Sequence, residues 1–131
     1  MQELNEHFQI LASKILGKTH KATVLYVYDG DTFVVDIPYW PDIVGKHMPI
    51  RVNGIDAPEI HDKRPEIADL AQKAKAKLTE LLENKKIALH NMRRDKYFRI
   101  LADVYVDGME VSKIMLDEKL VKEYHGESKT W

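Results

Sequence analysis

The sequence has 131 residues, of which 44% are hydrophobic and 31% charged, a balance typical of one globular domain rather than a disordered or membrane protein. The formal net charge of −1 argues against a protein that holds nucleic acid through a large overall excess of positive charge. There is no cysteine, so the fold has no disulfide and the redox compartment stays undetermined.

Residues 1–17 are predicted to form an amphipathic helix, joined through a linker that ends at residue 20 to a domain at 21–131. The helix has one apolar stripe, made of Leu4, Phe8, Leu11, Ile15 and Leu16. The stripe could dock on the domain or hold a second copy of the chain; we expect docking, and therefore a monomer. No secretory signal is visible, because the first residues carry glutamates and no cleavage site follows, so we expect a cytoplasmic protein.

An acidic turn, Asp29-Gly30-Asp31-Thr32, separates two runs of β-branched and aromatic residues at 23–28 and 33–37. The runs are predicted to be antiparallel strands. Taken alone the turn is most simply structural, because Asp and Gly are favoured in turns. Two downstream segments favour a chemical role: residues 51–59 add an arginine and two acids, and residues 95–99 add another arginine.

Residues 38–46 are predicted to be a loop, because they contain two prolines, a glycine and the adjacent aromatics Tyr39 and Trp40. These aromatics could stack on bases or pack on the end of a barrel, and we expect packing. A strand is predicted from Met48 to Ile55, and Pro58 takes the chain out of the sheet.

A helix is predicted from Pro65 to about Asn84, because leucine and alanine recur on one face and lysine on the other. Strands at 87–92 and 100–106 follow, then a tight turn at Asp107-Gly108 and a short helix over 111–115. The tail from 125 to 131 is polar and expected to be loose apart from its last residue. The pattern predicts a small β-barrel with two supporting helices.

A basic run lies between residues 85 and 99, where six lysines and arginines stand against the single acid Asp95. The run is compatible with a solvated surface or with a patch that faces phosphates, and the sequence leaves both open.

Asp31 and Asp56 follow different predicted strands, so both could project from one rim of the barrel toward one cation. Carboxylate oxygens suit Ca²⁺ or Mg²⁺, and the absence of cysteine disfavours zinc. Glu59 follows Asp56 by three residues across a proline, near enough to act on a metal-bound water.

Two arginines complete the candidate site. Arg51 precedes Asp56 on the entering strand, and Arg99 approaches from the basic run. Two guanidinium groups beside a carboxylate-held cation suit in-line attack on a phosphodiester, because the transition state gains negative charge on its equatorial oxygens.

The segments at 29–32, 50–59 and 95–99, in this order and at these separations, closely resemble the thermonuclease (staphylococcal nuclease-like) family over about residues 21–122. The resemblance implies a five-stranded OB-fold β-barrel with helices, mainly β in class. It further implies a calcium-dependent nuclease that hydrolyses DNA and RNA and leaves 3′-phosphate ends. By the same resemblance, Asp31, Asp56 and the carbonyl of Ala57 would bind calcium, and Glu59 would orient or deprotonate the attacking water.

The resemblance also implies that Arg51 and Arg99 bind the phosphate and stabilise the transition state. It places Tyr97 and Tyr124 near the nucleotide. The chain departs from the family pattern in having Phe98 where glycine is common, which could re-aim Arg99. It also departs in Ala57 where some members have threonine, in a longer loop around Trp40, and in the helix at 1–17.

A non-catalytic module that binds nucleic acid or protein on the same barrel is the competing interpretation. Such a module is expected to lack at least one of five side chains, namely Asp31, Arg51, Asp56, Glu59 and Arg99, and all five are present. A third interpretation, an assembly protein built on the N-terminal helix, predicts a stable oligomer without activity. The full set of five favours a nuclease.

Overall fold

The computed structural model describes residues 20–95, 97, 99–126 and 131. The helix predicted at 1–17 lies outside these residues, as does Phe98. His20, assigned above to the linker, is the first residue of a strand.

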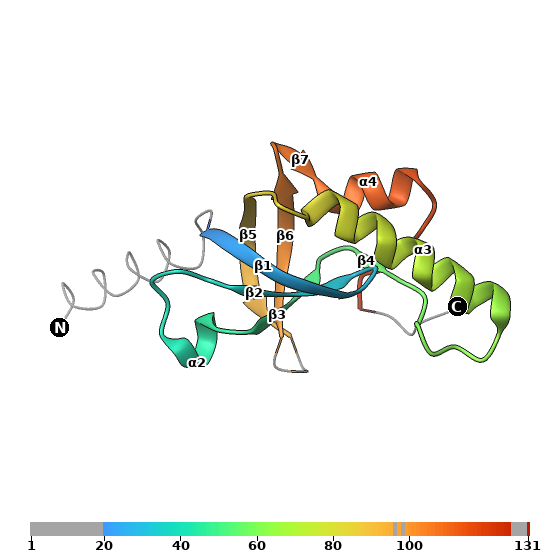
Figure 1. The fold of residues 1–131 in the computed structure, drawn as a ribbon, viewed down its shortest axis with the longest axis horizontal. Helices are drawn as coiled ribbons and strands as arrows, with labels where there is room; N and C mark the ends of the chain where they lie inside the picture. The colour runs from blue at the N-terminus through green and yellow to red at the C-terminus, as the bar shows by residue number, and fades with distance from the viewer. Residues whose placement is uncertain (1–19, 96, 98, 127–130) are drawn as a thin grey trace.

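Five strands form a closed barrel, as predicted (Figure 1). They are β1 (His20–Asp29), β2 (Thr32–Asp36), β3 (Met48–Val52), β5 (Ile87–Arg94) and β6 (Ile100–Val106). The antiparallel order is β3-β2-β1-β5-β6, and a parallel pairing of β3 with β6 closes the ring. A short strand, β7 (Met109–Glu110), extends the sheet beyond β6. β3 and β6 have no free edge over their paired residues. The interior of a barrel this small is filled by side chains of its strands.

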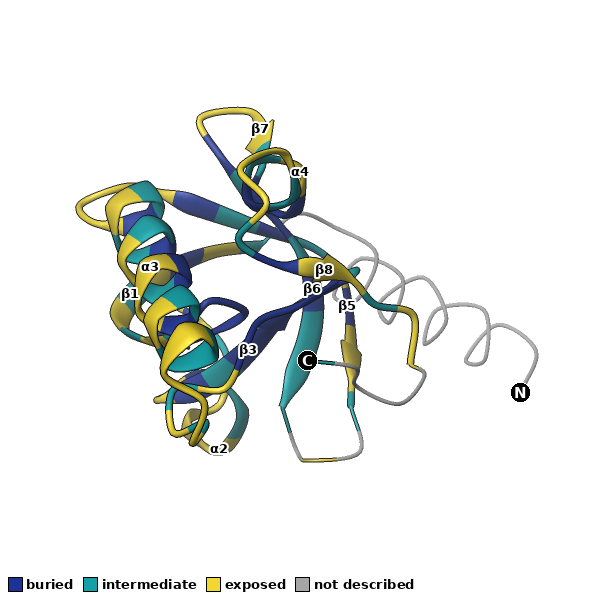
Figure 2. Cartoon of the chain, turned by 90° about the vertical axis from the view of Figure 1, so that its right-hand side faces the viewer, coloured by how far each residue is buried: buried dark blue, intermediate teal, exposed yellow. Residues whose placement is uncertain are grey.

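Two helices cover the barrel on one side (Figure 1). α3 (Pro65–Leu82) begins at a proline, whose missing N–H is tolerated in the first turn, and the chain turns at Asn84, which has φ 56°. The buried side of α3 faces the strands and its exposed side faces solvent (Figure 2). α4 (Val111–Asp117) packs against β6 and α3. Both helices were predicted, and neither they nor the other described helix could cross a membrane.

Three short elements differ from the prediction. The loop at 38–46 contains one helical turn, α2 (Asp42–Gly45). The predicted strand at 48–55 is divided, because Gly54 turns the chain at φ 88° between β3 and β4 (Ile55–Asp56). β4 pairs with β8 (Lys122–Glu123), which was not predicted. Two-residue strands are too short to produce a detectable alternation of apolar and polar residues.

The basic run does not form one patch. Lys85 precedes β5 and its Nζ lies 3.4 Å from a carboxylate oxygen of Asp107, whereas Arg93 and Arg94 end the same strand. A strand of eight residues separates its two ends by about 25 Å. Only the later half of the run can therefore contribute to the candidate site.

Gly30 is required by space rather than by backbone conformation. Its φ is not positive, but a Cβ atom at this position would lie 2.6 Å from Cβ of Ala74 on α3 and 2.9 Å from Cβ of Ala57. The acidic turn therefore packs directly against α3 and the segment after β4. This contact brings the residues that flank Gly30 close to Ala57.

We expect Gly30→Ala to destabilise the protein by about 1–3 kcal/mol, because the added methyl group overpacks a contact that has no room for it. Urea unfolding monitored by circular dichroism measures the change. A Gly30→Ala/Ala74→Gly double variant should lose less stability than the sum of the two single variants, since it removes one of the two clashes. A Gly30→Ala variant as stable as the parent would contradict the packing described.

Candidate active site

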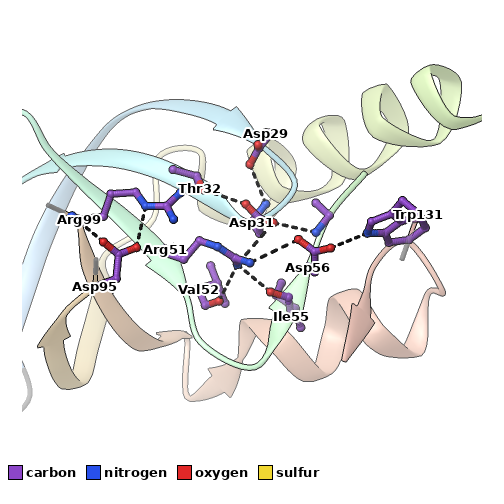
Figure 3. A network of polar contacts seen from close by, with 11 residues as sticks. Asp29, Asp31, Thr32, Arg51, Val52, Ile55, Asp56, Asp95, Arg99 and Trp131 are labelled. Carbon is purple, nitrogen blue, oxygen red and sulfur yellow. Dashed lines mark hydrogen bonds and ion pairs between the residues drawn. The ribbon is translucent and has the colours of Figure 1, made fainter. Parts of the chain in front are cut away.

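Arg51 lies at the centre of a buried polar network (Figure 3). Its Nη1 is 3.4 Å from Oδ2 of Asp31, and its Nη2 is 3.5 Å from Oδ1 of Asp56. All three side chains are nearly inaccessible to solvent, at 7%, 5% and 4% exposure. The two acids that the sequence predicted to share a rim are thus brought together by a buried guanidinium.

Arg51 also holds the backbone of the turn between β3 and β4. Its Nη1 donates hydrogen bonds to the carbonyl oxygens of Val52, at 3.1 Å, and Ile55, at 2.7 Å. This structural role was not predicted, because sequence patterns do not report hydrogen bonds from a side chain to nearby carbonyls. Arg51 therefore shapes the segment that carries Asp56.

The Asp31 carboxylate is oriented by two neighbours in addition to Arg51. Oδ1 accepts a hydrogen bond from the Thr32 hydroxyl at 2.8 Å, and Oδ2 accepts one from the Ala57 N–H at 2.7 Å. The backbone N–H of Asp31 donates to Oδ1 of Asp29 at 3.1 Å. Asp29 thus shapes the turn, and Asp31 links that turn to the segment after β4.

Asp56 has a partner that the sequence did not reveal. The indole Nε1–H of Trp131 donates a hydrogen bond of 2.8 Å to its Oδ2 (Figure 3). The only signal in the sequence was an isolated aromatic residue at the end of a polar tail. Its contact with Asp56 depends on chain folding over 75 positions, which a local pattern cannot show.

Several carboxyl groups lie close together at the acidic turn. Burial, together with the carboxylates of Asp31 and Glu59, raises the pKa of Asp29 from 3.8 to about 7. Glu59 itself is exposed. Among the described residues no three acid, histidine or cysteine side chains converge to form a metal site on their own. The oxygen donors of Asp31 and Asp56 are nevertheless the type that a hard cation prefers, with water completing its ligands.

An open cleft of about 1180 Å³ lies beside the network. Four predicted site residues line it: Arg51, Arg99, Tyr97 and Tyr124. Arg93, a member of the predicted basic run, also lines it, whereas the sequence did not single out Asn53 and His125. The described lining does not include Asp31, Asp56 or Glu59, and the two aspartates are joined to the cleft through Arg51.

Asp95 fixes the direction of Arg99. The Arg99 Nε donates to Oδ2 of Asp95 at 2.8 Å, and the guanidinium carbon lies 5.2 Å from the centre of the Tyr97 ring. Partial burial raises the pKa of Asp95, but the hydrogen bonds from the Arg99 and Tyr97 backbones and from the Arg99 side chain lower it more. The pKa of this carboxyl is therefore below its ordinary value, and Asp95 stays ionised beside Arg99.

Tyr124 is the second aromatic wall of the cleft. The guanidinium carbon of Arg51 lies 5.6 Å from the centre of its ring, and the Tyr124 N–H donates to the Gly54 carbonyl at 2.9 Å. The cleft therefore presents three arginines, Arg51, Arg93 and Arg99, and two tyrosines. Such a surface can bind phosphate through the guanidinium groups and stack bases on the rings.

Comparison with known proteins identifies similar sequences. The sequence model of a family described as staphylococcal nuclease homologues matches residues 49–129. The endonuclease YncB of Bacillus subtilis is 33% identical over 113 residues, which cover 84% of this chain and 51% of that protein. The thermonuclease of Staphylococcus hyicus is 32% identical over 102 residues, covering 76% of this chain and 54% of that protein.

A shorter match covers part of the barrel. The probable endonuclease lcl3 of Penicillium rubens is 39% identical over 66 residues, which cover 50% of this chain and 22% of that protein. The chain spans about half the length of the two bacterial relatives and a smaller part of the fungal one.

We expect Arg51→Met to destabilise the protein by about 3–5 kcal/mol in the presence of chelator, because it leaves two buried carboxylates without their common counter-charge. Urea unfolding measures the loss. Arg64→Met is the matched control, since the Arg64 side chain is 49% exposed and pairs with Asp62 at the surface. That variant should change stability by about 1 kcal/mol or less. Equal losses in the two variants would contradict the central position of Arg51.

Proposed function

Because this chain belongs to the staphylococcal nuclease family, we propose that it is a metal-dependent endonuclease that hydrolyses phosphodiester bonds of DNA or RNA. One observation carries the proposal: Arg51, which holds both buried acids, and Arg99 line the same open cleft. The names of the relatives, endonuclease and thermonuclease, support the reaction class.

The proposed cofactor is Ca²⁺, with Mg²⁺ as the other candidate. Asp31, Asp56 and the carbonyl of Ala57 would hold it, and the closeness of the Asp31 and Asp56 carboxylates to one guanidinium supports a cation at this place. When bound, a divalent cation would neutralise these carboxylates and supply positive charge close to the phosphate. Carboxylate, carbonyl and water oxygens together meet the preference of both ions for hard ligands.

In the proposed reaction a water molecule attacks the phosphorus in line with the leaving 5′ oxygen. Glu59 would accept the proton of that water, and its exposed position gives it access to solvent. The new oxygen–phosphorus bond forms as the bond to the 5′ oxygen breaks, and the 5′ oxygen takes a proton from solvent, which leaves a 3′-phosphate and a 5′-hydroxyl. Arg51 and Arg99 would bind the phosphate oxygens and stabilise the negative charge that develops on them.

Nucleotides on either side of the reacting phosphate would lie in the cleft. Tyr97 is 65% exposed and can stack on a base from the side of Arg99. Tyr124 forms the opposite part of the lining, beside Arg51. Stacking on aromatic rings tolerates any base, so we expect cleavage with little sequence preference and preferential use of single-stranded substrates.

The test is incubation of the protein with single-stranded DNA and RNA in Ca²⁺, in Mg²⁺ and in chelator. We expect cleavage that requires a divalent cation and gives 3′-phosphate ends. Glu59→Ala should lower the rate by about 10²–10⁴-fold, because it removes the group that accepts the proton, while the melting temperature stays close to that of the parent. Binding of the oligonucleotide without cleavage in any cation would instead favour the non-catalytic module.

Arg99→Ala should lower kcat by about 10²–10³-fold, because a preorganised donor to the transition state is lost. Lys85→Ala is the matched control: it removes one positive charge from the opposite end of β5 and should leave the rate unchanged. Rates are measured on one short oligonucleotide at saturating cation. An unchanged rate in Arg99→Ala would mean that this guanidinium does not reach the phosphate.

A further inference from the structure

Trp131 contacts one of the two carboxylates proposed as metal ligands, and nothing in the proposed mechanism uses it. Its Nε1–H donates to Oδ2 of Asp56 at 2.8 Å. Asp56 is 3% exposed, so this hydrogen bond is made in a site that is largely closed to water. An indole N–H is a neutral donor with no acceptor capacity, and it can satisfy a carboxylate oxygen without adding charge.

The C-terminal part of the chain brings the indole to this place. β8 pairs with β4 in a register that sets Lys122 opposite Asp56. The ammonium of Lys122 lies 4.3 Å from the centre of the Trp131 ring, a cation–π contact. β8 therefore runs beside Asp56 and also supplies Lys122, which contacts the Trp131 ring.

Each of the two carboxylate oxygens of Asp56 therefore has a partner of its own. Oδ1 lies 3.5 Å from Nη2 of Arg51, and Oδ2 accepts the indole hydrogen bond (Figure 3). A carboxylate with a partner on each oxygen cannot rotate about its last torsion without losing one of them. Residues that orient a ligand in this way contribute to metal affinity although they do not touch the metal.

We propose that Trp131 is a positioning residue: its N–H fixes the Asp56 carboxylate and thereby sets the affinity of the site for a divalent cation. The proposal rests on the proposed function, because it assumes that Asp56 is a metal ligand. It adds Trp131 to a proposed metal site whose ligands, Asp31, Asp56 and Ala57, all lie between the end of β1 and the residues after β4.

The first experiment measures calcium binding by titration calorimetry for the full-length parent, Trp131→Phe and Trp131→Ala. Trp131→Phe keeps an aromatic ring and removes the N–H, so it isolates the hydrogen bond. We expect both variants to bind calcium about 10–100-fold more weakly than the parent. Melting temperatures in chelator show whether each variant is folded, and Trp40→Phe is the control for loss of a tryptophan elsewhere.

The second experiment uses terbium, a luminescent ion that replaces calcium and is excited by a nearby indole. The chain has two tryptophans, so Trp40→Phe leaves Trp131 as the sole indole and Trp131→Phe leaves Trp40; excitation at the red edge of the indole band, where tyrosine does not absorb, selects the indole. We expect strong sensitised emission from Trp40→Phe that added calcium removes, and little emission from Trp131→Phe. Emission that depends on Trp40 instead would place the ion away from Asp56 and overturn the proposal.

Three results of the calorimetry would also overturn it. If Trp131→Phe binds calcium as tightly as the parent, the hydrogen bond does not matter, whatever the calcium affinity of Trp131→Ala. Tighter binding in Trp131→Phe would mean that the indole competes with the cation. A parent that does not bind calcium would remove the basis of the proposal. Cleavage assayed on the same preparations tests the proposed function separately. If the parent cleaves and Trp131→Phe binds calcium as tightly as the parent, the positioning role is refuted and the proposed function is not.

Discussion

The structure of the site depends on one buried guanidinium. Arg51 lies in β3 opposite Thr32 of β2 and Leu101 of β6, which is where the barrel closes. Removing a charged group from water is costly unless it is paired and hydrogen bonded, and Arg51 meets both conditions through two carboxylates and two carbonyl oxygens. Arg51 therefore stands where the barrel closes, and its side chain holds both acids at that place.

Arg99 reaches the same cleft in a different way. It lies just before β6 in the connection from β5, where its N–H donates to Oδ1 of Asp95 at 2.9 Å and its carbonyl accepts from the Asp95 N–H at 2.9 Å. These bonds are local to one turn and do not involve the barrel interior. The two arginines thus differ in what positions them: Arg51 is fixed by the closed sheet, and Arg99 by a single acid within its own turn. A change in the β5–β6 connection can move Arg99 without disturbing Arg51.

Much of the fold followed from the sequence, because the barrel strands and α3 are long enough for their apolar residues to show the expected spacing. The grouping of Asp31, Arg51 and Asp56 also followed, since each lies next to a strand end. Other features depend on contacts between distant segments, and local patterns do not show them. The pairing of β4 with β8 and the bond from Trp131 to Asp56 are of this kind. The residue roles and the metal stay predictions, because the fold alone does not test them.

The charge balance of the site argues that stability alone did not shape it. Two buried carboxylates, those of Asp31 and Asp56, share one guanidinium, and burial together with the carboxylates of Asp31 and Glu59 raises the pKa of Asp29. Buried ionic groups can often be replaced by apolar residues without loss of stability, so such a cluster is a poor way to stabilise a barrel. Groups with strongly shifted pKa values are typical of functional sites. The buried pair of Asp31 and Asp56 around one guanidinium therefore favours a chemical role for these acids over a structural one.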